Sequence, residues 1–120
     1  MSRHYRQIEV DQHGDVFCAR LRNPRLNEED IYDFSEDILQ LIDEDGCRKL
    51  VLDFGPKNPL CLFSIFLAKL VSIKRRLEKN GGGLKLAGVG PETYHIFEVC
   101  NLHNLFDFSP DQQTALAEFG

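Results

Sequence analysis

The segment Leu50-Val51-Leu52 constrains the fold of this chain most, because it is a continuous apolar run between charged residues. A strand that is apolar at every position is buried on both faces, as in parallel sheets covered by helices. Parallel strands need a long crossover connection, which is usually a helix. Apolar residues recur along 60–77 directly afterwards. The sequence therefore predicts a buried strand followed by a crossover helix.

The rest of the chain continues this alternation. Ile8 and Val10 alternate with polar residues, and His13-Gly14 supplies a turn before a second extended segment at 15–21, which together predict a β-hairpin. The other expected elements are helices at 28–45, 91–99 and 109–119 and strands at 84–89 and 105–108. This order predicts an α/β fold: an open mixed sheet with an N-terminal β-hairpin and about four α-helices.

Helix boundaries can be expected from capping residues. Asn27 is a good N-cap, residues 28–30 place negative charge in the first turn, and Gly46 suits a helix end. The acidic residues of this helix, Asp37 among them, are interpreted as its solvated face. For the crossover helix, Asn58 as N-cap and Pro59 at the first helical position predict the start. A run of three glycines at 81–83 predicts the end.

Length, composition and charge limit the function classes. At 120 residues, with 42% apolar and 28% charged residues, the sequence predicts one folded domain over 1–120. The formal net charge of −5 argues against nucleic acid and anionic membranes as partners. No apolar run reaches the roughly 18 to 20 residues that span a bilayer, and the N-terminus lacks an apolar signal core, so we expect a cytoplasmic protein.

Residues that carry chemistry are sparse. The four cysteines, at 18, 47, 61 and 100, form no Cys-x-x-Cys pair and are interpreted as core residues. No two histidines have the spacing of a zinc site, and no nucleophile has a readable histidine partner, so neither a metal, a cofactor nor catalysis is expected. Residues 88–92 precede a helix at the end of a strand, where nucleotides bind, but they lack a basic side chain.

Several segments together resemble a STAS domain, the module of anti-sigma factor antagonists and of the cytoplasmic tails of sulfate transporters. They are the strand Lys49–Phe54, the helix after it, Gly81–Leu86, Val89-Gly90-Pro91-Glu92 before a helix, and Asn101–Phe106. The resemblance covers nearly the whole chain. It implies a regulator of transcription or signal transduction that binds a protein partner, and it does not imply an enzyme.

The family's functional motif lies at the start of the second helix and usually reads Asp-Ser-Ser/Thr-Gly. The resemblance implies that a cognate serine kinase, which doubles as the anti-sigma factor, phosphorylates the second hydroxyl. The matching segment here is Leu62-Phe63-Ser64-Ile65, so Ser64 is the phospho-acceptor candidate and the other three positions depart from the motif. A helix start at Asn58 places Ser64 in the second turn, where its hydroxyl can instead bond a carbonyl one turn back.

The start of the crossover helix holds more apolar residues than one helix face can bury against a sheet. We therefore expect part of it to be exposed and to bind a partner. The expected partner-binding residues are Asn58, Leu60, Leu62, Phe63, Ile65 and Phe66. The leading hypothesis is a partner of the anti-sigma factor or switch-kinase class. The alternative is a structural homodimer or assembly subunit that uses the same patch without phosphorylation.

Overall fold

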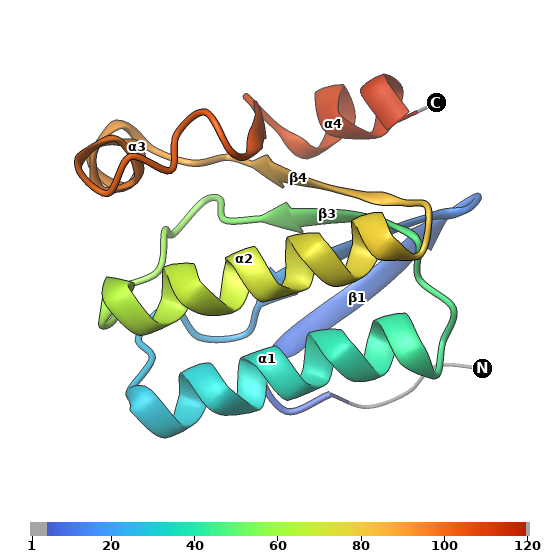
Figure 1. Cartoon of the computed structure of the whole chain (residues 1–120), viewed down its shortest axis with the longest axis horizontal. Helices are drawn as coiled ribbons and strands as arrows, with labels where there is room; N and C mark the ends of the chain where they lie inside the picture. The colour runs from blue at the N-terminus through green and yellow to red at the C-terminus, as the bar shows by residue number, and fades with distance from the viewer. Residues whose placement is uncertain (1–4, 120) are drawn as a thin grey trace.

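The computed structural model describes residues 5–119 and contains five strands and four helices within that range (Figure 1). The strands are β1 (Ile8–His13), β2 (Val16–Leu21), β3 (Lys49–Asp53), β4 (Gly83–Ala87) and β5 (Asp107–Ser109). The helices are α1 (Glu28–Asp43), α2 (Phe63–Lys79), α3 (Pro91–Val99) and α4 (Gln112–Phe119). The order confirms the predicted α/β fold, and β5 begins two residues later than expected.

The five strands form one mixed sheet in the order β1-β2-β3-β4-β5. β1 and β2 make the predicted antiparallel hairpin, and all other neighbouring strands are parallel. In β3, the middle strand, Leu50 lies between Phe17 of β2 and Leu84 of β4. The continuous apolar run therefore occupies the centre of the sheet.

Helices cover both faces of the sheet, which explains why β3 is apolar at successive positions. On one face, α1 and α2 lie side by side (Figure 1), and Leu50 and Leu52 join their core with Phe66. On the other face, Val51 packs in a smaller cluster with Ala115 of α4. Alternate residues of one strand thus serve two separate cores.

The start of α1 agrees with its predicted cap. The Asn27 side chain accepts a hydrogen bond from the Asp30 amide (2.7 Å), and the Asp30 carboxylate accepts one from the Asn27 amide (3.0 Å). This is a complete capping box. Gly46 follows the helix end with a positive φ of 76°.

One acidic residue of α1 departs from the prediction of a solvated face. Asp37 is buried, and its carboxylate accepts a hydrogen bond from the Gln7 amide at 2.7 Å. Burial raises the pKa of Asp37 above its ordinary value, although the Gln7 amide and Arg6 oppose that shift. The carboxylate fastens the chain before β1 onto α1, a long-range role that the periodicity did not indicate.

The predicted start of α2 is wrong, because the helix begins at Phe63 and its N-cap is Leu62. The reason is backbone pairing with the loop before α1. The Leu60 amide donates to Pro24 O (2.8 Å), and Leu60 O accepts from the Leu26 amide (3.1 Å). These bonds hold the segment after Pro59 extended, so helical dihedral angles begin only beyond it.

α2 ends where the run of three glycines at 81–83 predicted its end. Asn80 is the C-cap, Gly81 has a positive φ of 84°, and the Gly82 amide donates to Leu77 O at 2.8 Å. A Cβ at Gly82 would lie 1.7 Å from Arg48 O, so the turn into β4 requires glycine there. Within residues 5–119, none of the helices is both long and apolar enough to cross a lipid bilayer.

Candidate functional site

The predicted site residues lie in the β3–α2 loop and the first turns of α2, but only some of them are exposed. Leu60 and Leu62 are 60% and 56% exposed, whereas Phe63 and Ile65 are half-buried. Phe66 is fully buried. The expectation that Phe66 belongs to a partner-facing surface is therefore wrong.

Phe66 is a core residue because helix geometry points it at the sheet. Its ring centroid lies 5.4 Å from that of Phe34 in α1 and 5.9 Å from that of Phe54 after β3. Phe63 packs edge-to-face on it at 6.1 Å. Phe63 thus has one side in the core and one side at the surface.

Ser64 is exposed in the first turn of α2, not in the second turn as expected. The carbonyl one turn back belongs to Leu60, and it accepts the Leu26 amide. Leu62 provides no side-chain cap, and the first turn holds no acidic residue. Ser64 therefore lies beside backbone amides that no side chain of the first turn satisfies.

Asn58 connects this loop to the β4–α3 loop. Its side-chain oxygen accepts the Gly90 amide at 2.8 Å, and its side-chain nitrogen donates to Gly88 O (3.2 Å) and Phe54 O (3.4 Å). Gly90 is the N-cap of α3. The side-chain amide of Asn58 is thus used inside the chain and is not directed at a partner.

The two loops also touch through their backbones. A Cβ at Gly88, whose φ is 70°, would lie 2.9 Å from Gly55 N and 3.0 Å from Asp53 Oδ1. The Gly88 amide donates to Ser109 O (3.2 Å). Because the amides of Gly88 and Gly90 already have acceptors, neither is available to the phosphate of a nucleotide.

The polar chemistry near the site is limited. Cys61 lies in the loop, but burial raises the pKa of its thiol to about 11, so it is not a thiolate at neutral pH. Within the part of the chain that the structure describes, no three histidine, cysteine, aspartate or glutamate side chains could hold a metal ion.

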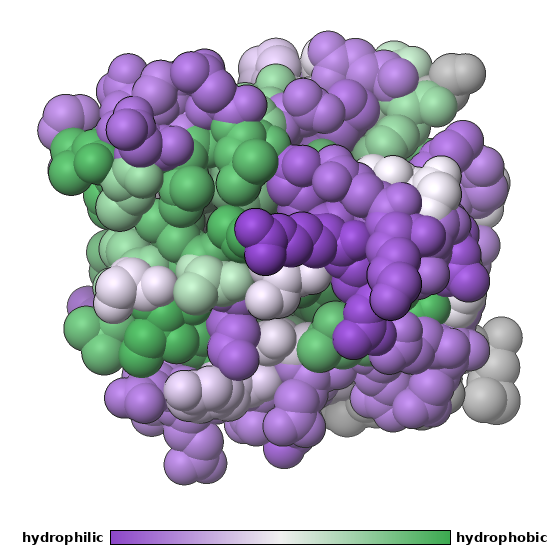
Figure 2. Space-filling model, viewed as in Figure 1, coloured by the Kyte–Doolittle hydropathy of each residue, from purple (hydrophilic) through white to green (hydrophobic). Residues whose placement is uncertain are grey.

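Exposed apolar side chains gather at one end of the molecule. Figure 2 shows this hydrophobic surface at the left, where Figure 1 places α3 and the start of α2. Among the exposed large apolar residues, Leu60 and Leu62 lie just before α2, Val99 (72% exposed) is the last residue of α3, and Leu105 (42% exposed) follows α3. Val99 lies two positions after buried Phe97, and helix geometry therefore places it on the outer face of α3.

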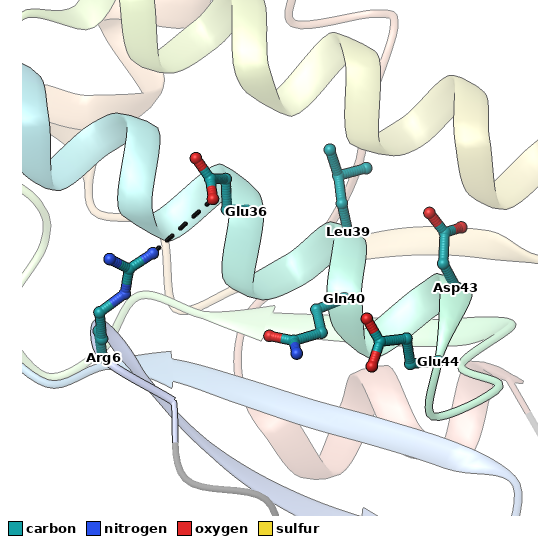
Figure 3. A pocket seen from close by; sticks show the side chains of 6 residues that line it. All are labelled: Arg6, Glu36, Leu39, Gln40, Asp43 and Glu44. Atoms are coloured by element: carbon teal, nitrogen blue, oxygen red, sulfur yellow. Dashed lines mark ion pairs between the residues drawn. The ribbon is translucent and has the colours of Figure 1, made fainter.

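A hollow elsewhere on the surface has a different character (Figure 3). It is lined by Arg6, Glu36, Leu39, Gln40, Asp43 and Glu44. Three of its side chains are held by ion pairs, Arg6 with Glu36 at 3.8 Å and Asp43 with Arg76 at 2.7 Å. None of the predicted partner-binding residues, and not Ser64, lines this hollow.

Solved structures share this fold. An anti-sigma factor antagonist from Mycobacterium paratuberculosis has a TM-score of 0.78 at 20% identity, covering 93% of this chain and 92% of that one. A Thermotoga maritima protein described as an anti-sigma factor antagonist has a TM-score of 0.76 at 20% identity over 93% of both chains. The Bacillus cell fate determinant SpoIIAA in its phosphorylated form has a TM-score of 0.69 at 13% identity, over 92% and 97%.

At these identities the structural matches establish the fold alone, and a comparison with curated proteins gave no significant match. The family follows from the sequence itself. A family model, described as STAS domain, matches residues 7–115, which include the hairpin, the β3–α2 loop and the first half of α4. The chain therefore belongs to the STAS domain family.

Proposed function

We propose that this protein is a cytoplasmic regulator that binds an anti-sigma factor or a switch-kinase-like protein through its docking surface. We define the docking surface as Leu60, Leu62 and the outer side of Phe63. The observation that carries the proposal is the exposure of two leucines at the start of α2, directly beside exposed Ser64. Exposed apolar clusters of this kind mark sites where another protein packs.

The partner class is taken from the family and from its solved members. Two features support it: the STAS family match and the likeness to anti-sigma factor antagonists. Unlike the family's motif, the start of α2 holds no acidic residue. A partner can thus cover it without burying a carboxylate, which would cost several kcal/mol.

Phosphorylation of Ser64 is the proposed switch. A phosphate carries about −1.5 to −2 charges at neutral pH, and at the start of α2 it would gain about 0.3–1 kcal/mol from the helix dipole. Under a docked apolar partner the same charge would be desolvated without an ion pair, which costs several kcal/mol. The modified protein therefore keeps its fold and releases its partner.

The test is affinity capture from cells followed by binding measurements with the purified partner. We expect a protein with a kinase fold to be retained by the wild type and lost with Leu60→Asp. Tyr32→Asp is the matched control, because it adds the same charge to an exposed apolar residue of α1, outside the docking surface. Equal retention by Leu60→Asp and the wild type would refute the docking surface.

Two further measurements separate the switch from the alternatives. Mass spectrometry of the native protein should detect phosphorylated Ser64, and finding only the unmodified peptide under several growth conditions would refute the switch. Sedimentation at high concentration should show a monomer. A dimer that Leu60→Asp dissociates would instead support a homodimer or assembly subunit.

A further inference from the structure

The β3–α2 loop carries the docking surface, and one side chain of this loop contacts the start of α3. Asn58 lies 32 residues before Gly90 in sequence, yet its Oδ1 accepts the Gly90 amide at 2.8 Å. Its Nδ2 donates to Gly88 O in the same β4–α3 loop. Two of its three hydrogen bonds thus cross between the loops.

The crossing is tight as well as polar. A Cβ added at Gly88 would lie 2.9 Å from Gly55 N and 3.0 Å from Asp53 Oδ1, which is closer than ordinary van der Waals contact. Gly90, whose amide contacts Asn58, also uses its carbonyl: Gly90 O accepts the Tyr94 amide at 2.8 Å. This is the first backbone hydrogen bond of α3. Asn58 therefore reaches the first turn of α3 through Gly90.

We propose that Asn58 is a positioning residue that makes the docking loop and the start of α3 one mechanical unit. A partner that covers Leu60 and Leu62 would then also restrain α3, whose far end carries Val99. This effect of a partner rests on the proposed function, whereas the coupling between the loops does not.

The coupling is tested on the full chain without a partner, by hydrogen exchange resolved at individual amides. Asn58→Ala should speed exchange in residues 54–60 and also in Gly90 and the first amides of α3, by about fivefold or more, because each lost hydrogen bond opens the local structure. Unchanged exchange in α3, with faster exchange in the β3–α2 loop, would overturn the proposal.

Asn23→Ala is the matched control. Asn23 is also a loop asparagine whose side-chain oxygen accepts a backbone amide, that of Arg25 at 3.0 Å, but its contact stays within its own loop. We expect this variant to leave exchange in α3 as in the wild type. An equal effect of both variants on α3 would reduce the Asn58 result to general loosening and refute the specific coupling.

An NMR spectrum of the wild type gives a second test, which does not depend on whether a variant folds. The side-chain amide protons of Asn58 should exchange several-fold more slowly than those of exposed Asn80, and should show Overhauser contacts to Gly88. Fast exchange equal to that of Asn80, without those contacts, would contradict the coupling. Because no partner is present, this failure is distinct from a failure of the docking surface, which Leu60→Asp tests.

Discussion

The starts of α1 and α2 lie next to each other but are built in opposite ways. Leu26, just before α1, and Leu60, just before α2, are joined by a backbone hydrogen bond. α1 begins with Asn27, a capping box and three acidic residues. α2 begins with Leu62, no side-chain cap and no acidic residue.

The start of α2 thus lacks the capping side chain and the acidic residues that stabilise the start of α1. An N-cap residue such as Asn or Asp stabilises a helix by about 0.5–2 kcal/mol relative to an apolar one. The start of α2 instead exposes Leu62 at the N-cap position and Leu60 two residues earlier. We interpret the start of α1 as built for stability and the start of α2 as built for contact with a partner.

The largest expected effect separates the buried and exposed parts of the predicted site. Phe66→Ala should lower the free energy of unfolding by about 3–5 kcal/mol, because it leaves a cavity between Phe34 and Phe54. Leu60→Ala, at an exposed position, should change it by less than about 0.5 kcal/mol. Urea denaturation of both variants measures this. Similar losses for the two would mean that Leu60 is structural and that the docking surface is not free.

The next effect concerns the cap of α1. Asn27→Ala removes the acceptor of the Asp30 amide and should lower the free energy of unfolding by about 1 kcal/mol. Glu28→Gln is the control, since it keeps the capping box and removes only a charge of the first turn. Chemical denaturation at low and high salt distinguishes them: the Asn27→Ala loss should persist in salt. A loss that salt abolishes would show that charge, and not capping, stabilises α1.

A smaller effect depends on pH and on the buried carboxyl of α1. Since burial raises the pKa of Asp37 above 3.8, the folded protein holds this proton more tightly than the unfolded chain does. Its contribution to stability is therefore complete below about that pH and is lost as pH rises through the folded pKa. The groups that face it are the Gln7 amide, Arg6 and Asp33.

Asp37→Asn keeps an oxygen for the Gln7 amide and removes the titration. Relative to the wild type, this variant should gain stability as pH is raised from 4 to 7, measured by urea denaturation at each pH. Asp37→Ala, which removes the acceptor as well, should be less stable than Asp37→Asn throughout. A difference between wild type and Asp37→Asn that stays constant with pH would contradict the raised pKa.

Whether a feature was predictable depended on how far apart in sequence its contacts lie. The α1 cap joins residues three positions apart, and Gly81 ends α2 through its own dihedral angle, so the sequence alone indicates both. The start of α2 depends on Leu60 pairing with Pro24 and Leu26, far earlier in the chain. Local signals at Asn58 and Pro59 therefore gave the wrong boundary.

The candidate site divides in the same way. Apolar density predicted an exposed surface, and Leu60 and Leu62 are exposed. Apolar density alone does not show which side of the helix faces the sheet, and it places Phe66 wrongly at the surface. The spacing of Phe66, Leu70, Ile73 and Leu77, which are all buried, is the signal that assigns Phe66 to the core face. The role of Asn58 was not predictable, because its partners Gly88 and Gly90 lie about 30 positions away.

The most direct test of the comparison is the free energy of unfolding of Leu62→Asp, measured by urea denaturation at pH 7. Leu62 already has extended N-cap dihedral angles, φ −75° and ψ 98°, so an aspartate there can accept a free amide of the first turn. We expect the variant to be more stable than the wild type by about 0.5–1 kcal/mol. A loss of 1 kcal/mol or more would show that Leu62 stabilises this fold itself, and that the start of α2 is not reserved for a partner.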